Sequence, residues 1–185
     1  MLFGEFLTKA TVWLAVIAYT AGTVQMLFAR HRGARLAWTL GCAFFLAHVA
    51  CAFGFYHHWS HAAAYADTAR QTQTMTGLNW GGGLYLNDLF AAAWFAEVLW
   101  WWTSSTSFLR RPAWLVRTWH GFYFFMIVNG TIVFGHGPAR WLGAMVVVAL
   151  TIAVTLRARG SLPTGRYPAP PDPSPPRARR FDDPL

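Results

Sequence analysis

The stretch LAWTLGCAFFLAHVACAFGFYH, from Leu36 to His57, contains no Lys, Arg, Asp or Glu. About 20 apolar residues in one helix are enough to cross the hydrocarbon core of a bilayer. Only helices and closed barrels satisfy their backbone polar groups in lipid, and this stretch lacks the alternating pattern of a barrel strand. The stretch therefore predicts a transmembrane helix.

Four more apolar stretches of similar character lie along the chain. The predicted spans cover residues 11–29, 36–57, 84–103, 118–135 and 141–156, and the first of them can begin as early as Phe6. Signal peptides carry positive charge before their apolar core. Here the arginines from Arg30 to Arg35 follow the first span, so we expect this span to be retained. The sequence predicts an all-α integral membrane protein, with a bundle of about five transmembrane helices in residues 1–160.

The composition supports this fold class and excludes a typical cytosolic enzyme. Hydrophobic residues make up 55% of the chain and charged residues only 12%, against about 25% charged residues in an ordinary soluble domain. Too few charged side chains remain to cover a soluble globule of 185 residues. The net charge of +8 is compatible with a nucleic-acid partner, so the positions of the basic residues have to be considered.

The basic residues predict the orientation, because cytoplasmic loops carry an excess of Lys and Arg. If residues 30–35 lie in the cytoplasm, the outer side holds only Lys9, Arg70 and Arg140 of the 15 basic residues. The N-terminus is then outside and the C-terminus cytoplasmic, in a multi-pass protein of the inner (cytoplasmic) membrane. Because the charge follows the membrane orientation, we expect a lipid bilayer as partner and no nucleic acid.

Two segments lie outside the predicted spans. The outer loop covers residues 58–83, and its stretch from Ser60 to Gln73 is suited to a short surface helix with Ser60 as N-cap. The cytoplasmic tail, residues 161–185, is rich in Pro and Arg and has little to bury. Such a tail is extended on its own and gains order by binding a partner or anionic lipid. We therefore expect other membrane protein subunits.

Histidines gather at the predicted outer face. Three of them, His57, His58 and His61, lie within five residues, and His136 follows the fourth span. If the second helix continues past His57, then His57 and His61 share one helical face, as paired metal-binding histidines do. The candidate ligands of a Cu or Zn ion or of one haem iron are these four histidines, with Asp88 orienting them. Hydrogen bonding at the wet interface and proton handling are the alternatives.

Four polar residues are predicted inside the bilayer, where ionisable groups are costly and often functional. At about 1.5 Å per helical residue, His48 and Asn129 lie near mid-membrane, and Glu97 and His120 lie nearer the inner boundary. We expect His48 to bond to Asn129 or to a backbone carbonyl. We expect Glu97 to pair with His120 or to stay protonated.

These features predict a small polytopic membrane subunit of a larger assembly, with a redox or electron-transfer role. The size, the near absence of soluble segments and the tail favour a subunit, and the outer histidines favour a metal or haem. A free-standing membrane metalloenzyme that uses the same histidines is one alternative. A purely structural scaffold subunit without metal is the other.

Overall fold

The structure, a computed structural model, describes residues 2–135 and 137–159. The predicted ligand His136 and the tail 161–185 lie outside these residues. All regular structure within the described residues is helical. The elements are α1 (Leu2–Leu27), α2 (His31–Phe55), α3 (His61–Thr76), α4 (Gly83–Thr103), α5 (Ser105–Leu109), α6 (Ala113–Val128), the π-helix η1 (Asn129–Val133) and α7 (Pro138–Ala158).

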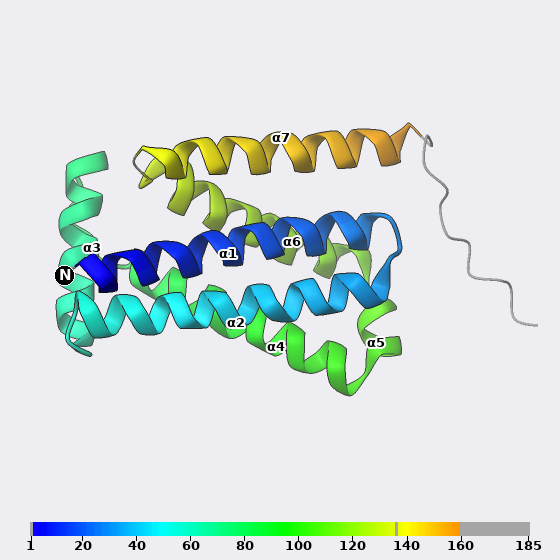
Figure 1. The fold of residues 1–185 in the computed structure, drawn as a ribbon, viewed down its shortest axis with the longest axis horizontal. Helices are drawn as coiled ribbons and strands as arrows, with labels where there is room; N and C mark the ends of the chain where they lie inside the picture. The colour runs from blue at the N-terminus through cyan, green and yellow to red at the C-terminus, as the bar shows by residue number, and fades with distance from the viewer. Residues whose placement is uncertain (1, 136, 160–185) are drawn as a thin grey trace, which may run out of the picture.

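Five helical segments run along the long axis of the molecule. Figure 1 shows α1, α2, α4, α6 and α7 along this axis, with α3 lying across one end and the short α5 at the other. Helical segments lie over most of each of the five predicted spans, with α6 and η1 together over the fourth, and α1 begins at Leu2, well before residue 11. Three of the described helices, α1, α2 and α7, are long and apolar enough to cross a membrane.

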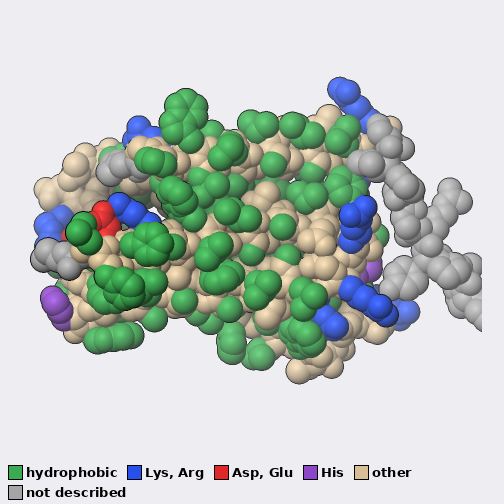
Figure 2. All heavy atoms as spheres, viewed as in Figure 1, with side chains coloured by type: hydrophobic (Ala, Val, Ile, Leu, Met, Phe, Trp, Pro, Cys, Tyr) green, Lys and Arg blue, Asp and Glu red, His purple; other side chains and the backbone are tan. Residues whose placement is uncertain are grey.

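The outer surface of the bundle is apolar. Figure 2 shows hydrophobic side chains along the visible face, with Lys and Arg toward the two ends. Large apolar side chains such as Ile17, Leu40 and Val148 are more than half exposed. Exposure of this apolar surface to water would be energetically unfavourable, whereas lipid tails are apolar as well. The apolar helices indicate a membrane environment.

Aromatic rings fill the centre of the bundle. Trp38 of α2 and Trp94 of α4 are almost fully buried, with ring centroids 5.3 Å apart. Tyr19 of α1 and Tyr123 of α6 pack against both. Gly41 makes room for this packing, since a Cβ there would lie 2.7 Å from the Trp94 ring. The packing of aromatic rings thus holds four helices around one core.

The helix α3 forms where the sequence predicts a surface helix. The Ser60 hydroxyl accepts a hydrogen bond from the Ala63 backbone N–H at 3.2 Å, so the predicted N-cap is confirmed. The helix ends at Gly77, whose φ of +80° favours glycine. Its buried residues, Ala64 and Ala69, are small.

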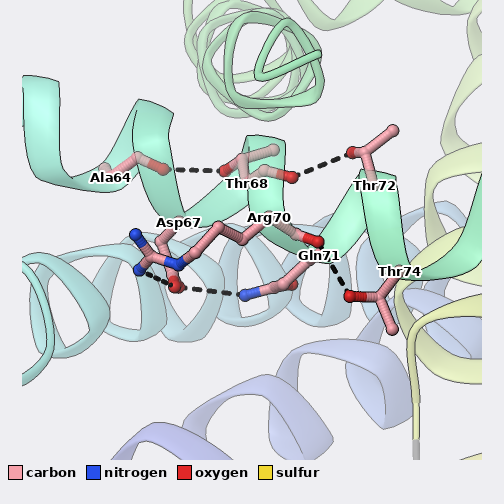
Figure 3. A network of polar contacts seen from close by, with 7 residues as sticks. All are labelled: Ala64, Asp67, Thr68, Arg70, Gln71, Thr72 and Thr74. Carbon is pink, nitrogen blue, oxygen red and sulfur yellow. Dashed lines mark hydrogen bonds and ion pairs between the residues drawn. The ribbon is translucent and has the colours of Figure 1, made fainter. Parts of the chain in front are cut away.

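A polar network runs along α3. Figure 3 shows the Asp67 carboxylate accepting from Arg70 at 2.6 Å and from the Gln71 amide at 3.0 Å. Threonine hydroxyls of this helix donate to backbone carbonyls one turn earlier: Thr68 to Ala64, Thr72 to Thr68 and Thr74 to Arg70. Asp67 therefore fixes the position of Gln71.

Candidate functional site

The three outer histidines lie at the turn between α2 and α3. The helix α2 ends at Phe55, so the condition under which His57 and His61 would share one helical face is not met. His58 and Trp59 adopt positive φ angles of 48° and 60°, and α3 begins at His61. The turn is closed by the Trp59 N–H, which donates to the Phe53 carbonyl at 2.9 Å. His57 and His61 therefore belong to different elements and do not share a helical face.

The structure brings one of these histidines to the predicted acidic partner. His61 Nε2 lies 3.6 Å from a carboxylate oxygen of Asp88, and both side chains are about half exposed. The His57 and His61 rings both approach Phe53, with ring centroids 5.8 Å and 6.4 Å from it. No group of three His, Cys, Asp or Glu residues within the described part of the chain is arranged to hold a metal ion.

A cavity of about 450 Å³, the central cavity, lies between the helices of the bundle and extends to α3 at one end. Its walls come from α1, α2, α4, α6 and η1, and include aromatic residues of the core such as Phe45, Phe90 and Trp94. Gln71 of α3 and its neighbours Thr68 and Thr72 line it as well. The volume falls in the range of about 300–1,000 Å³ that is usual for small-molecule sites.

His48 and Asn129, the two residues predicted at mid-membrane, both line this cavity. His48 Nδ1 lies 2.9 Å from the backbone carbonyl oxygen of Thr8 in α1. The prediction of a backbone carbonyl as its partner is confirmed. A carbonyl oxygen only accepts hydrogen bonds, so Nδ1 carries the hydrogen and Nε2 of the neutral ring carries the lone pair.

The tautomer of His48 matters chemically. An imidazole that ligates a metal with one nitrogen almost always donates its other N–H to a carboxylate, a backbone carbonyl or water. The bond to Thr8 supplies this second contact and fixes the orientation of the ring. The Nε2 lone pair of His48, a residue that lines the cavity, is suited to a metal centre or to a hydrogen-bond donor on a ligand.

One wall of the central cavity is an irregular helix. From Asn129 to Val133 the chain forms a π-helix, in which the Phe134 N–H donates to the Asn129 carbonyl at 2.9 Å. Such segments are rare and are often found at functional sites. The π-helix was not predicted, and the only signal for it in the sequence is the Asn129-Gly130 pair inside an apolar stretch, since both residues favour irregular backbone.

Near the opposite end of the bundle, Glu97 pairs with Arg111. An Arg111 guanidinium nitrogen donates to a Glu97 carboxylate oxygen at 2.8 Å, and the two side chains are only 4% and 5% exposed. The expectation that Glu97 pairs with His120 is therefore wrong. Arg111 follows α5, stacks 3.7 Å above the Phe108 ring and reaches Glu97 from there. His120 packs on Trp38 instead, with ring centroids 5.4 Å apart.

Comparison of the chain with family models, with curated proteins and with solved structures finds no match. Of the predicted residues, His48 and Asn129 both line the central cavity. His61 Nε2 lies 3.6 Å from the Asp88 carboxylate. Glu97 and His120 lie on neighbouring helices with different partners.

Proposed function

We propose that the chain crosses the inner membrane five times, with the N-terminus outside and the C-terminus in the cytoplasm. In addition to the three apolar helices, α4 covers 21 residues, and α6 with η1 runs unbroken from Ala113 to Val133. At about 1.5 Å per residue each reaches roughly 30 Å, the thickness of the hydrocarbon core. Glu97 of α4 is buried and paired with Arg111, so its carboxylate does not meet lipid.

The distribution of charge supports this topology. Eight arginines belong to one end of the bundle, at the α1–α2 turn, around α5 and the first turns of α6, and at the end of α7: Arg30, Arg32, Arg35, Arg110, Arg111, Arg117, Arg157 and Arg159. The other end holds Lys9, Arg70 and Arg140 together with Glu5, Asp67 and Asp88. An excess of arginine on one side marks that side as cytoplasmic.

In the proposed function, the protein is a small subunit of a larger membrane assembly with a redox role, and it holds one cofactor in the central cavity. The orientation of His48 is the observation that carries this proposal. Its bond to Thr8 leaves Nε2 as the free base of a ring that lines the cavity, whose walls include the aromatic rings of Phe45, Phe90 and Trp94. A flat, largely apolar cofactor with a metal centre, such as a haem, fits this chemistry, and when bound it would supply one-electron transfer.

A second candidate site is the outer group of His57, His58, His61 and Asp88. The 3.6 Å contact between His61 and Asp88 favours it, because a carboxylate beside an imidazole is a common arrangement around metal ions. A Cu or Zn ion is the ligand that this group would hold, with His136 as the further candidate named by the sequence. A free-standing metalloenzyme would use the same residues.

The test compares purified wild-type protein in mild detergent with two variants. In His48→Asn the side-chain amide retains a donor for the Thr8 carbonyl but loses the basic ring nitrogen. The second variant is His57→Ala/His58→Ala/His61→Ala. We expect a visible chromophore and bound iron in the wild type, lost in His48→Asn and retained in the triple variant.

Other outcomes distinguish the alternatives. Loss of metal from the triple variant alone would show that the metal is bound by the outer group and not at His48. Fresh wild-type protein with neither chromophore nor metal would overturn the redox proposal and leave the structural scaffold. Stable protein partners in the same preparation support a subunit, whereas a single chain that turns over a substrate supports a free-standing enzyme.

A further inference from the structure

A second cavity lies between α6 and α7, away from the central one. The helix α7 contacts η1, which continues α6, near Gly143. A Cβ added at Gly143 would lie 2.7 Å from Ile132 of η1. From there α6 and α7 diverge toward the arginine-rich end of the bundle (Figure 1). A cavity of about 820 Å³ lies between the diverging helices, with further walls from α1 and α5.

This cavity has an apolar interior and a basic rim. Met26, Leu150 and Val154 are among the apolar side chains that line it. Arg117 and Arg157 line it as well, and none of the described residues that line it is Asp or Glu. Arg111, also part of the lining, is neutralised by Glu97. The positive charge that remains belongs to Arg117 in the first turns of α6 and to Arg157 at the end of α7, which also donates to the Leu27 backbone carbonyl.

The cavity also opens on the outer surface of the bundle, which faces lipid in the five-span arrangement proposed above. Phe124 and Val154, which both line it, are 36% and 54% exposed on the sides of α6 and α7. A molecule in the bilayer could thus enter sideways, with its apolar part between the helices. Basic pockets between transmembrane helices on the cytoplasmic side are typical sites for acidic lipid headgroups.

We propose that this cavity binds one anionic phospholipid, with an acyl chain between α6 and α7 and the phosphate between Arg117 and Arg157. Guanidinium groups match phosphate geometry through paired N–H donors. The apolar interior distinguishes this ligand from a free phosphate ion, which has nothing to place there. The proposal is independent of the cofactor at His48, since the two cavities share only Tyr19.

The first experiment measures lipid binding to the full-length protein after delipidation in mild detergent. Phosphatidylglycerol, phosphatidylcholine and inorganic phosphate are added separately, and retained lipid is counted by native mass spectrometry while the melting temperature is recorded. We expect one retained phosphatidylglycerol and a raised melting temperature. Phosphatidylcholine binding with equal affinity would overturn the proposal, as would equal stabilisation by inorganic phosphate, which would indicate a simple anion site.

The second experiment uses two variants and a matched control. Arg117→Gln/Arg157→Gln removes the charge at the rim, and we expect phosphatidylglycerol to bind roughly tenfold more weakly or worse, since charge-assisted hydrogen bonds are the strong ones. Arg32→Gln/Arg110→Gln removes the same charge from exposed positions outside the cavity lining, and should retain the affinity. An equal loss in this control would indicate non-specific attraction and overturn the proposal.

A third variant leaves every charge in place. Gly121 lines the cavity, and a Cβ added there has no heavy atom within 4 Å, so Gly121→Leu extends into open space. We expect it to fold normally and to lose the bound lipid because it occupies the position of the acyl chain. Normal lipid retention in Gly121→Leu would contradict the proposed position of the chain, even if the arginine variant failed to fold.

Discussion

The ion pair of Glu97 and Arg111 shows how strongly the stability of this bundle can depend on a single residue. Both side chains are almost fully buried, so each charge depends on the other. Removal of one partner of a buried pair typically destabilises a protein by about 3–5 kcal/mol, because the other charge is left uncompensated. We expect Glu97→Gln and Arg111→Gln each to lower the free energy of unfolding by that order, measured by SDS titration in mixed micelles.

The exposed pair of Asp67 and Arg70 is the matched control. Its side chains are 34% and 69% exposed, and exposed pairs contribute only about 0–1 kcal/mol. Asp67→Asn should therefore change the free energy of unfolding little. A double variant, Glu97→Gln/Arg111→Met, should be less destabilised than either single variant. Equal unfolding of Glu97→Gln and wild type would contradict a structural role for the pair.

At this scale the sequence predicted which residues face the interior but not all of their partners. Glu97 was expected inside the bundle because an ionisable group is costly in lipid, and it is there. Its partner Arg111 lies outside the predicted spans, and a long arginine side chain extends well beyond its backbone position. The Thr8 carbonyl beside His48 could not be identified, since the relative rotation of α1 and α2 depends on tertiary packing.

Among the elements, the close contact of α7 with η1 depends on Gly143. A Cβ at this position would overlap the Thr131 side chain and approach Ile132. Overpacking of a tight contact costs about 1–3 kcal/mol. We expect Gly143→Ala to lower the melting temperature in detergent, whereas Gly121→Ala, which meets no atom, should leave it unchanged or raise it through better helix propensity. An unchanged melting temperature in Gly143→Ala would contradict this contact.

The stability of the first turn of α3 depends on its N-cap, Ser60. Replacement of a Ser N-cap by Ala costs about 0.5–2 kcal/mol, because a backbone N–H loses its acceptor. Ser60→Ala should therefore increase amide hydrogen exchange in the first turn of α3, from His61 onward, and leave α7 unaffected. Exchange that rises equally in both helices would indicate a global effect and not the loss of a cap.

The elements were largely predictable from local sequence signals. Apolar length predicted a helix over each span, and Ser60 marked the beginning of α3. The end of α2 was placed two residues late, at His57, because the turn there has no Gly or Pro to mark it and instead uses positive φ at His58 and Trp59. The π-helix has no sequence rule comparable to a helix cap, so the wall of the central cavity appeared only in the structure.

At the scale of the whole molecule, we propose that the chain crosses the membrane five times. Three described helices meet the criterion of length and apolar character. The helix α4 is rich in Trp and carries Asp88 and Glu97, and α6 alone has only 16 residues, which is why apolar character alone does not identify them. In a three-span arrangement α5 would lie outside, whereas in the five-span arrangement it lies in the cytoplasm. The side of the membrane on which α5 lies therefore distinguishes the three-span from the five-span arrangement.

Cysteine labelling in right-side-out membrane vesicles makes this measurement. Single cysteines are placed at Thr106 in α5 and at Thr74 in α3, both exposed, in a chain whose Cys42 and Cys51 are replaced by alanine. With a membrane-impermeant maleimide, the five-span account predicts that Thr74→Cys is labelled at once and Thr106→Cys only after the vesicles are opened. Immediate labelling of both cysteines would contradict it.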